Sequence, residues 1–164
     1  MSGANDLKQV GRRQKVTLLS TQLRRYRELV GAAFGVTDLE KAAGFSIDQL
    51  VRVDLEADGV DEVLFSAQQT IGLRRVVGDQ VATVLLPEPR PEADRWGTPA
   101  ILGFWDSDSD GRLEVLVGSG DPLAGVGPQW IGYWLVSANP GSPPALLASS
   151  GCVVEGPPKP WGHH

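Results

Sequence analysis

Cysteine and histidine are almost absent from the sequence. Cys152 is the only cysteine, so no disulfide can form within the chain. The only histidines, His163 and His164, are the last two residues, which argues against a serine–histidine–aspartate site or a histidine-ligated metal. A glycine-rich phosphate-binding motif with its lysine is also missing. Stability must therefore come from the core, with or without bound ions, and the usual catalytic groups are few.

Long apolar runs and concentrated basic segments are absent too. No run approaches the roughly 20 apolar residues that a helix needs to cross a bilayer, and the first 16 residues lack the apolar segment of a signal peptide. The short basic groups are Arg12-Arg13, Arg24-Arg25 and Arg74-Arg75, none of which makes a continuous basic footprint. We therefore expect no membrane span and no nucleic-acid partner.

Glycine and proline, by contrast, are abundant. With 20 glycines and 12 prolines in 164 residues, the composition favours a loop-rich β architecture, and the length fits one domain. We expect a mobile polar lead over residues 1–15 and a single β-rich domain over 16–152, with repeat units at about 46–98 and 99–152. A proline- and glycine-rich tail should follow over residues 153–164.

The hydrophobic pattern changes near Gly44. Before it, apolar residues recur every three or four positions from Thr21 to Ala33, which predicts one N-terminal helix. After it, short apolar runs separated by turn residues predict strands. These runs are Ile47, Leu50–Val53, Val63–Phe65, Val81–Leu86, Ile101–Trp105, Val115–Val117, Trp130–Val136 and Ala145–Leu147. The predicted fold is mainly β (α+β): an N-terminal helix followed by two tandem β-meander units, each with a strand–loop–strand hairpin.

The acidic residues gather in two windows. Residues 54–62 and 106–114 hold nine of the chain's 20 acids and one base, Arg112, so the remaining residues carry a small positive balance. The acidity is therefore local and not a general solvating bias.

The two windows belong to an internal repeat. Placing Asp54 over Asp106 aligns segments 49–65 and 101–117 at a constant offset of 52 residues, with acids, glycine and the following apolar triplet in register. Such an alignment indicates a repeated supersecondary unit.

Each copy places acids at loop positions 1, 3, 5 and 9 and glycine at position 6. An extended strand would spread positions 1 and 5 over roughly 13 Å, so only a tight loop can bring the acids to one ion. Glycine permits the positive φ of such a loop, and the turn aims the carbonyl of position 7 inward. Carboxylates with one carbonyl and water suit calcium, which takes six to eight oxygens. The predicted metal ligands are Asp54, Glu56, Asp58, Val60 and Glu62 in the first copy, and Asp106, Asp108, Asp110, Arg112 and Glu114 in the second.

The pattern is not that of an EF-hand, which requires glutamate at position 12, where this chain has Phe65 and Val117. It resembles instead the strand-flanked calcium loop of FG-GAP, integrin-like repeats. That resemblance covers about residues 47–66 and 99–118 and implies two calcium ions, one per loop. Glu56 departs from the aspartate usual at position 3, and the Phe-Gly and Gly-Ala-Pro signatures are missing from the expected places. Two repeats also cannot close a propeller of about four to eight blades.

Three functional readings are open at this point. The resemblance implies a calcium-binding structural or binding module, extracytoplasmic although no signal peptide is present, whose ions do no catalysis. Its partner is an unknown protein or glycan, which Trp96 or Trp161 could contact. The alternative is a hydrolase acting on glycans or phosphoesters through an acidic-loop metal site. In the third, aspartate, serine and glycine simply form turns that bind nothing.

Overall fold

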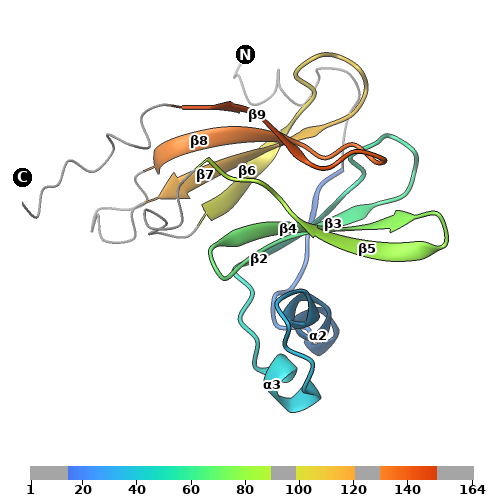
Figure 1. Ribbon diagram of the computed structural model, residues 1–164, viewed down its shortest axis with the longest axis vertical. Helices are drawn as coiled ribbons and strands as arrows, with labels where there is room; N and C mark the ends of the chain where they lie inside the picture. The colour runs from blue at the N-terminus through green and yellow to red at the C-terminus, as the bar shows by residue number, and fades with distance from the viewer. Residues whose placement is uncertain (1–14, 90–98, 121–129, 151–164) are drawn as a thin grey trace, which may run out of the picture.

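The computed structural model describes residues 15–89, 99–120 and 130–150, which form two antiparallel sheets and two helices (Figure 1). The prediction of a mainly β fold is therefore confirmed. Apart from Lys15, the predicted polar lead lies outside the described residues, as does the predicted tail. Neither helix in this part of the chain has the length and apolarity that a membrane crossing requires.

Neighbouring strands in each sheet follow the order of the chain. The first sheet consists of β1 (Thr17–Leu18), β2 (Gln49–Val53), β3 (Glu62–Ala67), β4 (Thr70–Val77) and β5 (Gln80–Leu85). The second sheet consists of β6 (Pro99–Trp105), β7 (Glu114–Gly120), β8 (Trp130–Ser137) and β9 (Ala145–Ser149). The helices are α2 (Arg24–Ala33) and α3 (Leu39–Ala43).

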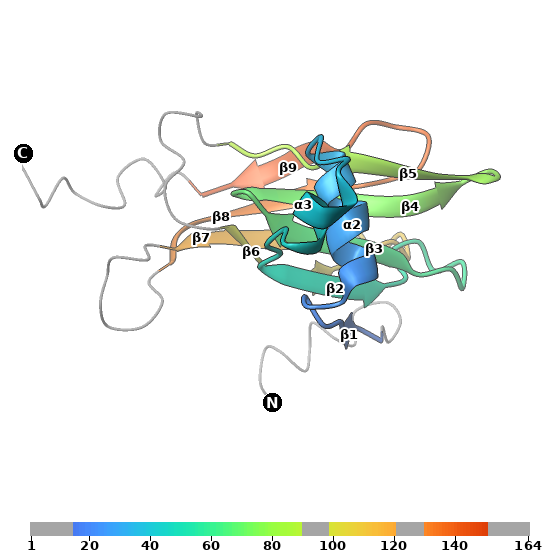
Figure 2. The same cartoon turned by 90° about the horizontal axis from the view of Figure 1, so that it is seen from below.

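Both helices cover one face of the first sheet (Figure 2). The apolar side of α2 contributes Val30, which packs with residues of β2 and β3 in a small core. Phe65 of β3 is fully buried there, and its ring lies directly over Gly72 of the neighbouring strand, where no side chain would fit. Asp38 caps the N-terminus of helix α3: its carboxylate accepts hydrogen bonds from the free amides of Glu40 and Lys41.

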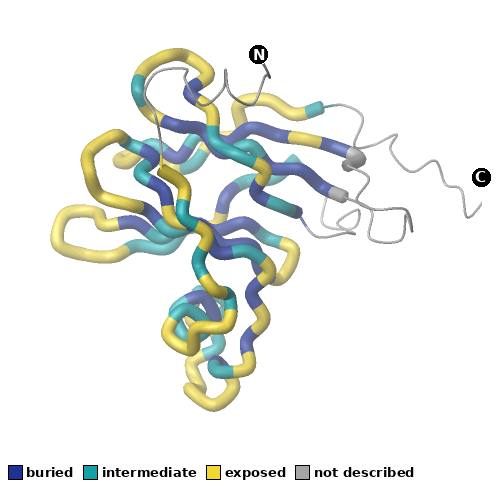
Figure 3. Tube along the Cα trace, turned by 180° about the vertical axis from the view of Figure 1, so that it is seen from behind, coloured by how far each residue is buried: buried dark blue, intermediate teal, exposed yellow. Residues whose placement is uncertain are grey.

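The main core lies between the two sheets. Alternate residues of a strand share a face, so each strand sends every second side chain into this layer. Figure 3 shows the result as buried strand centres and exposed connecting loops. The largest fully buried side chains of this core are Val53, Leu55, Leu64 and Leu73 from the first repeat and Val115, Val117 and Val136 from the second.

The two sheets are stacked with equivalent faces pointing the same way. In β3, Leu64 faces the second sheet, whereas Phe65 faces the helices. In β7, Val117, which aligns with Phe65, faces the first sheet. The face of the second sheet that is equivalent to the inner face of the first therefore points away from the core. The second repeat unit thus packs on the first in the same orientation, and the helices cover the opposite face of the first unit.

Two strands were not expected from the sequence. Strand β1 is a two-residue edge piece, and β4 is an eight-residue interior strand between β3 and β5 of the first sheet. Ile47, conversely, lies before β2 and in no strand, although it is buried against the helices. Strand β4 matters for the site because it carries Arg75.

Candidate metal centre

Each acidic window forms the connection of a hairpin. The first loop (residues 54–62) joins β2 to β3, and the second loop (residues 106–114) joins β6 to β7. In both, the residue before position 1 pairs with the glutamate at position 9: Val53 with Glu62, and Trp105 with Glu114. The strand register thereby brings the two ends of each loop together, so that position 9 lies next to position 1.

The two loops have the same backbone conformation. Position 6 is left-handed in both, with φ of 85° at Gly59 and 87° at Gly111. Position 4 is left-handed as well, although it is not glycine: φ is 64° at Ala57 and 60° at Ser109. A non-glycine residue with positive φ is uncommon, so its occurrence at equivalent positions marks a specific loop geometry.

The aspartate at position 1 organises this backbone. In the second loop the amides of Asp110 and Gly111 donate to Oδ1 and Oδ2 of Asp106 at 3.0 and 2.9 Å. In the first loop the amides of Asp58 and Gly59 donate to Asp54 in the same way, at 3.2 and 2.8 Å. One carboxylate therefore satisfies two consecutive amides and turns the chain back upon itself.

Positions 5 and 9 make further equivalent bonds. The position 7 amides of Val60 and Arg112 donate to the position 5 aspartates at 2.9 and 2.8 Å. The position 2 amide donates to the position 9 glutamate, at 2.9 Å from Leu55 to Glu62 and at 2.8 Å in the second loop. All these equivalent bonds show that the repeat in the sequence is a repeat in structure.

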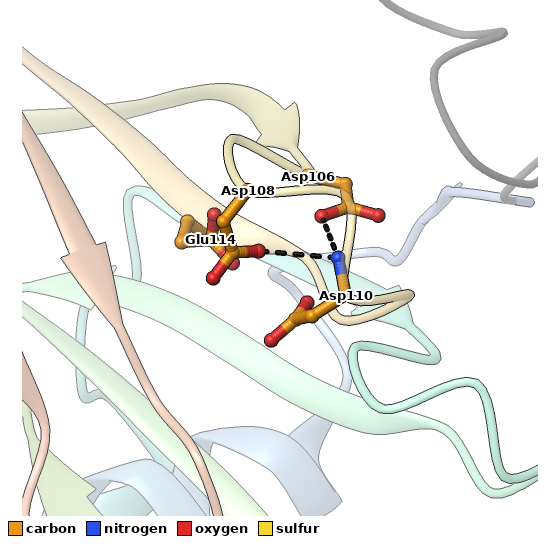
Figure 4. Close-up of side chains that lie close together, drawn as sticks. All are labelled: Asp106, Asp108, Asp110 and Glu114. Atoms are coloured by element: carbon orange, nitrogen blue, oxygen red, sulfur yellow. Dashed lines mark hydrogen bonds between the residues drawn. The ribbon is translucent and has the colours of Figure 1, made fainter.

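In the second loop all four acids converge. One carboxylate oxygen from each of Asp106, Asp108, Asp110 and Glu114 lies within 4.8 Å of the others (Figure 4). Asp106 and Glu114 are buried, at 3 % and 4 % exposure, and Asp108 and Asp110 are exposed. The group thus has a buried floor and an open side through which a solvated ion could enter.

Carboxylates this close disfavour the ionised form. Burial raises the pKa of Glu114, with a further increase from the charges of Asp108 and Asp110, while hydrogen bonds from Ser107 oppose the rise. The pKa of Asp108 is raised as well, first by desolvation and then by the side chains of Asp110 and Asp106, while a hydrogen bond from the Asp110 amide opposes the rise. A cation placed among these oxygens would remove this repulsion.

The first loop brings fewer acids together. Oxygens of Asp54, Asp58 and Glu62 lie within 4.8 Å of one another, and Glu56 is not in this group. Its Oε1 lies instead 3.4 Å from Nη1 of Arg75, in an ion pair that is largely buried. The structure therefore groups three of the four predicted acids of the first loop and turns the fourth toward an arginine.

Glu62 is the most perturbed acid of the first loop. Its pKa is raised from 4.5 to about 7, mainly by burial, with smaller increases from Glu56 and Asp54. The Leu55 amide and the charge of Arg75 oppose the rise. Glu62 therefore binds a proton near neutral pH when no cation is present.

The two loops also touch. The Leu113 amide of the second loop donates a 2.8 Å hydrogen bond to the Leu55 carbonyl of the first, and both side chains are buried in the main core. The acidic groups are thus neighbours at one end of the sandwich. This hydrogen bond links the backbones of the two loops directly.

The donor set of both groups fits a hard divalent cation. All side-chain donors are carboxylate oxygens, which suit calcium, magnesium and manganese and do not suit softer metals. Each hydrogen-bonded carboxylate keeps acceptor capacity, since every oxygen has a second lone pair. The two acidic groups could therefore hold a metal ion. The carbonyls of Val60 and Arg112 stay predicted ligands, because the hydrogen bonds observed at these two residues are donated by their amides.

Two residues that contact the acids were not predicted, Ser107 within the second loop and Arg75 outside the first. The hydroxyl of Ser107 donates to Glu114, an interaction that Leu55 cannot make at the equivalent position. Arg75 comes from β4, outside the repeated segment, and only the fold brings it to the first loop. Trp96 and Trp161, the predicted partner contacts, lie outside the described residues.

No protein-family model matches the chain, and no curated protein or solved structure is significantly similar to it.

Proposed function

We propose that this chain is a calcium-binding structural or binding module of the FG-GAP type, in which calcium rigidifies the two acidic loops. The observation that carries the proposal is the convergence of Asp106, Asp108, Asp110 and Glu114 in a loop whose backbone is repeated at the first loop. In this proposal the ions do no catalysis, and their role is to fix the shape of the hairpin ends.

Calcium is favoured over magnesium by the number of protein oxygens. Magnesium retains several waters and binds through one or two carboxylates, whereas calcium accepts six to eight oxygens in flexible geometry. Four carboxylates with the position 7 carbonyl and water approach that number in the second loop. Because the carboxylates repel one another without the ion, binding should order the loop as well as occupy it.

The proposed setting is extracytoplasmic, where free calcium is plentiful, and the proposed partner is a protein or glycan. Both follow from the resemblance to FG-GAP repeats. The rigid hairpin ends would then present a fixed surface to that partner.

The test is thermal unfolding after chelation, with calcium or magnesium added back. Calcium at about 100 times its dissociation constant should stabilise the fold by about 3 kcal/mol, which raises the midpoint by roughly 5–10 °C for a domain of this size. Magnesium should have a smaller effect. Asp110→Ala should remove most of the calcium-induced rise.

Asp58→Ala is the matched variant, because it removes the position 5 acid of the first loop. It should retain the larger part of the rise, since the second loop has the fuller set of acids. Identical midpoints with and without calcium in the unsubstituted protein would refute the proposal. The loops would then be turns that bind nothing.

A further inference from the structure

The two loops differ most at position 3. In the second loop Asp108 belongs to the acidic group and is exposed. In the first loop Glu56 faces Arg75. Since the backbones of the loops are equivalent, the difference comes from the side chains around them.

Arg75 is a buried cation on the inner face of the first sheet. It alternates with Ile71 and Leu73 along β4, so its side chain enters the layer between the sheets, and it is 8 % exposed. Its Nη2 donates to the carbonyl of Ala138, just beyond β8. Within the described residues its Nε has no hydrogen-bond partner.

A buried guanidinium needs an anion, because the cost of removing its charge from water is otherwise uncompensated. Glu56 supplies the anion at 3.4 Å, and its own side chain is 17 % exposed. The carboxylate that would complete the acidic group of the first loop is therefore used to neutralise Arg75. A second arginine, Arg52, pairs with Asp61 of the same loop at 3.3 Å.

The second repeat has no cation at the position that corresponds to Arg75. Val63 pairs with Arg74 and Val115 with Val136, so extending each register by one residue places Arg75 opposite Glu62 and Ser137 opposite Glu114. Ser137 is neutral and lies on the outward face of the second sheet. The position 9 glutamate thus has an arginine as cross-strand neighbour in the first repeat and a serine in the second.

We propose that Arg75 is an internal cation that holds Glu56 away from the first loop and lowers the calcium affinity of that loop. The chain then binds one ion tightly at the second loop and another weakly at the first, and Arg75 sets the difference. This inference rests on the proposed function. Its physical basis is twofold: Glu56 is withdrawn from the ligand set, and a positive charge lies beside the position that the ion would take.

The experiment isolates the first loop. In a background of Asp108→Ala, which weakens the second loop, calcium is titrated calorimetrically into the chelator-treated full-length protein. Adding Arg75→Ser, the residue that the second repeat has at this position, should raise the affinity of the first loop by about tenfold. Adding Glu56→Asp should also raise it, because aspartate is one methylene shorter, cannot reach Arg75 and matches Asp108.

Glu56→Gln is the control for the carboxylate. It breaks the ion pair without supplying an acid to the loop, so it should give no gain in affinity. A gain equal to that of Glu56→Asp would overturn the inference. Circular dichroism checks the fold of each variant, and if Arg75→Ser does not fold, the comparison of Glu56→Asp with Glu56→Gln decides.

The failure of this inference differs from the failure of the proposed function. If the unsubstituted protein binds no calcium, the proposed function is refuted and this inference with it. If it binds calcium while Arg75→Ser and Glu56→Asp leave the affinity of the first loop unchanged, only the role of Arg75 is refuted. Two equally tight sites in the unsubstituted protein would also refute it.

Discussion

The first and second loops share a backbone and differ in charge. Both use position 1 to bind two consecutive amides, and both place positions 4 and 6 in the left-handed region. Around that common frame, the second loop gathers four acids and the first gathers three with an arginine nearby. Loop shape is therefore set by local hydrogen bonds, whereas the charge around each loop also depends on side chains that the rest of the fold supplies.

Substitution of the position 6 glycines tests the shared backbone. Alanine at Gly59 or Gly111 must adopt a positive φ, so each variant should lose about 1–2 kcal/mol of stability, by similar amounts. Chemical denaturation in the presence of chelator measures this without the ion. Gly103→Ala is the control, because Gly103 has open space around it and no positive φ, and its stability should change by less than about 0.5 kcal/mol. Clearly unequal losses in the two loops would break the equivalence.

The pH dependence of stability tests the difference in charge. The folded-state pKa of Glu62 is raised from 4.5 to about 7, so its stabilising protonated form is fully present below 4.5 and is lost as the pH rises through 7. After treatment with chelator, the protein should lose about 1 kcal/mol of its free energy of unfolding between pH 5 and 8 because of this group, once solvent screening is allowed for.

Glu62→Gln should reduce that loss, because glutamine cannot ionise. Glu114→Gln is the matched variant in the second loop, where the pKa is also raised. Denaturation curves at several pH values make the measurement. A stability that rises from pH 5 to 8, or a loss that Glu62→Gln leaves unchanged, would contradict the assignment to Glu62.

The smallest expected effect comes from adding a cation beside the second loop. Ser137→Arg places an arginine opposite Glu114, as Arg75 lies opposite Glu62, and should lower the calcium affinity of the second loop by about threefold. The effect should be modest because Ser137 is only half-buried, so solvent and salt screen the added charge. Ser137→Gln controls for side-chain size. Calorimetric titration at low and high salt should show the difference shrinking as salt increases.

The sequence predicts the loops well because their signal is local. Acids at fixed positions, a glycine at position 6 and apolar flanks are enough to indicate a hairpin with converging carboxylates. The left-handed residues Ala57 and Ser109 carry no such signal, since neither residue type favours a positive φ. Their conformation follows from the two amides held by position 1.

Strand β4 escaped prediction because its boundaries and interior are unusual. The turn before it consists of Gln68 and Gln69, both with positive φ, where glycine or asparagine would be expected. Gly72 and the pair Arg74-Arg75 then interrupt the apolar run. Gly72 is needed beneath the ring of Phe65, and Arg75 is balanced by Glu56. Both reasons depend on contacts with other elements, so no pattern within the segment reveals them.

The same limit applies to Glu56. From the sequence it is one more acid at a ligand position, so it is predicted as a fourth acidic ligand of the first loop. Its partner lies on a strand 19 residues further along the chain, and the pairing exists only once β3 and β4 are side by side. Counting carboxylates predicts where ions could bind, but the cations that compete for those carboxylates are known only from the fold.

The hydrogen bond from Leu113 to Leu55 makes one amide a reporter of both hairpin ends. If either loop opens, this amide loses its acceptor or its position and can exchange its hydrogen with solvent. We therefore expect deuterium uptake at Leu113 to slow when calcium orders the second loop, and to slow again if the first loop is also filled. A single peptide covering this residue would follow the stepwise ordering of both loops.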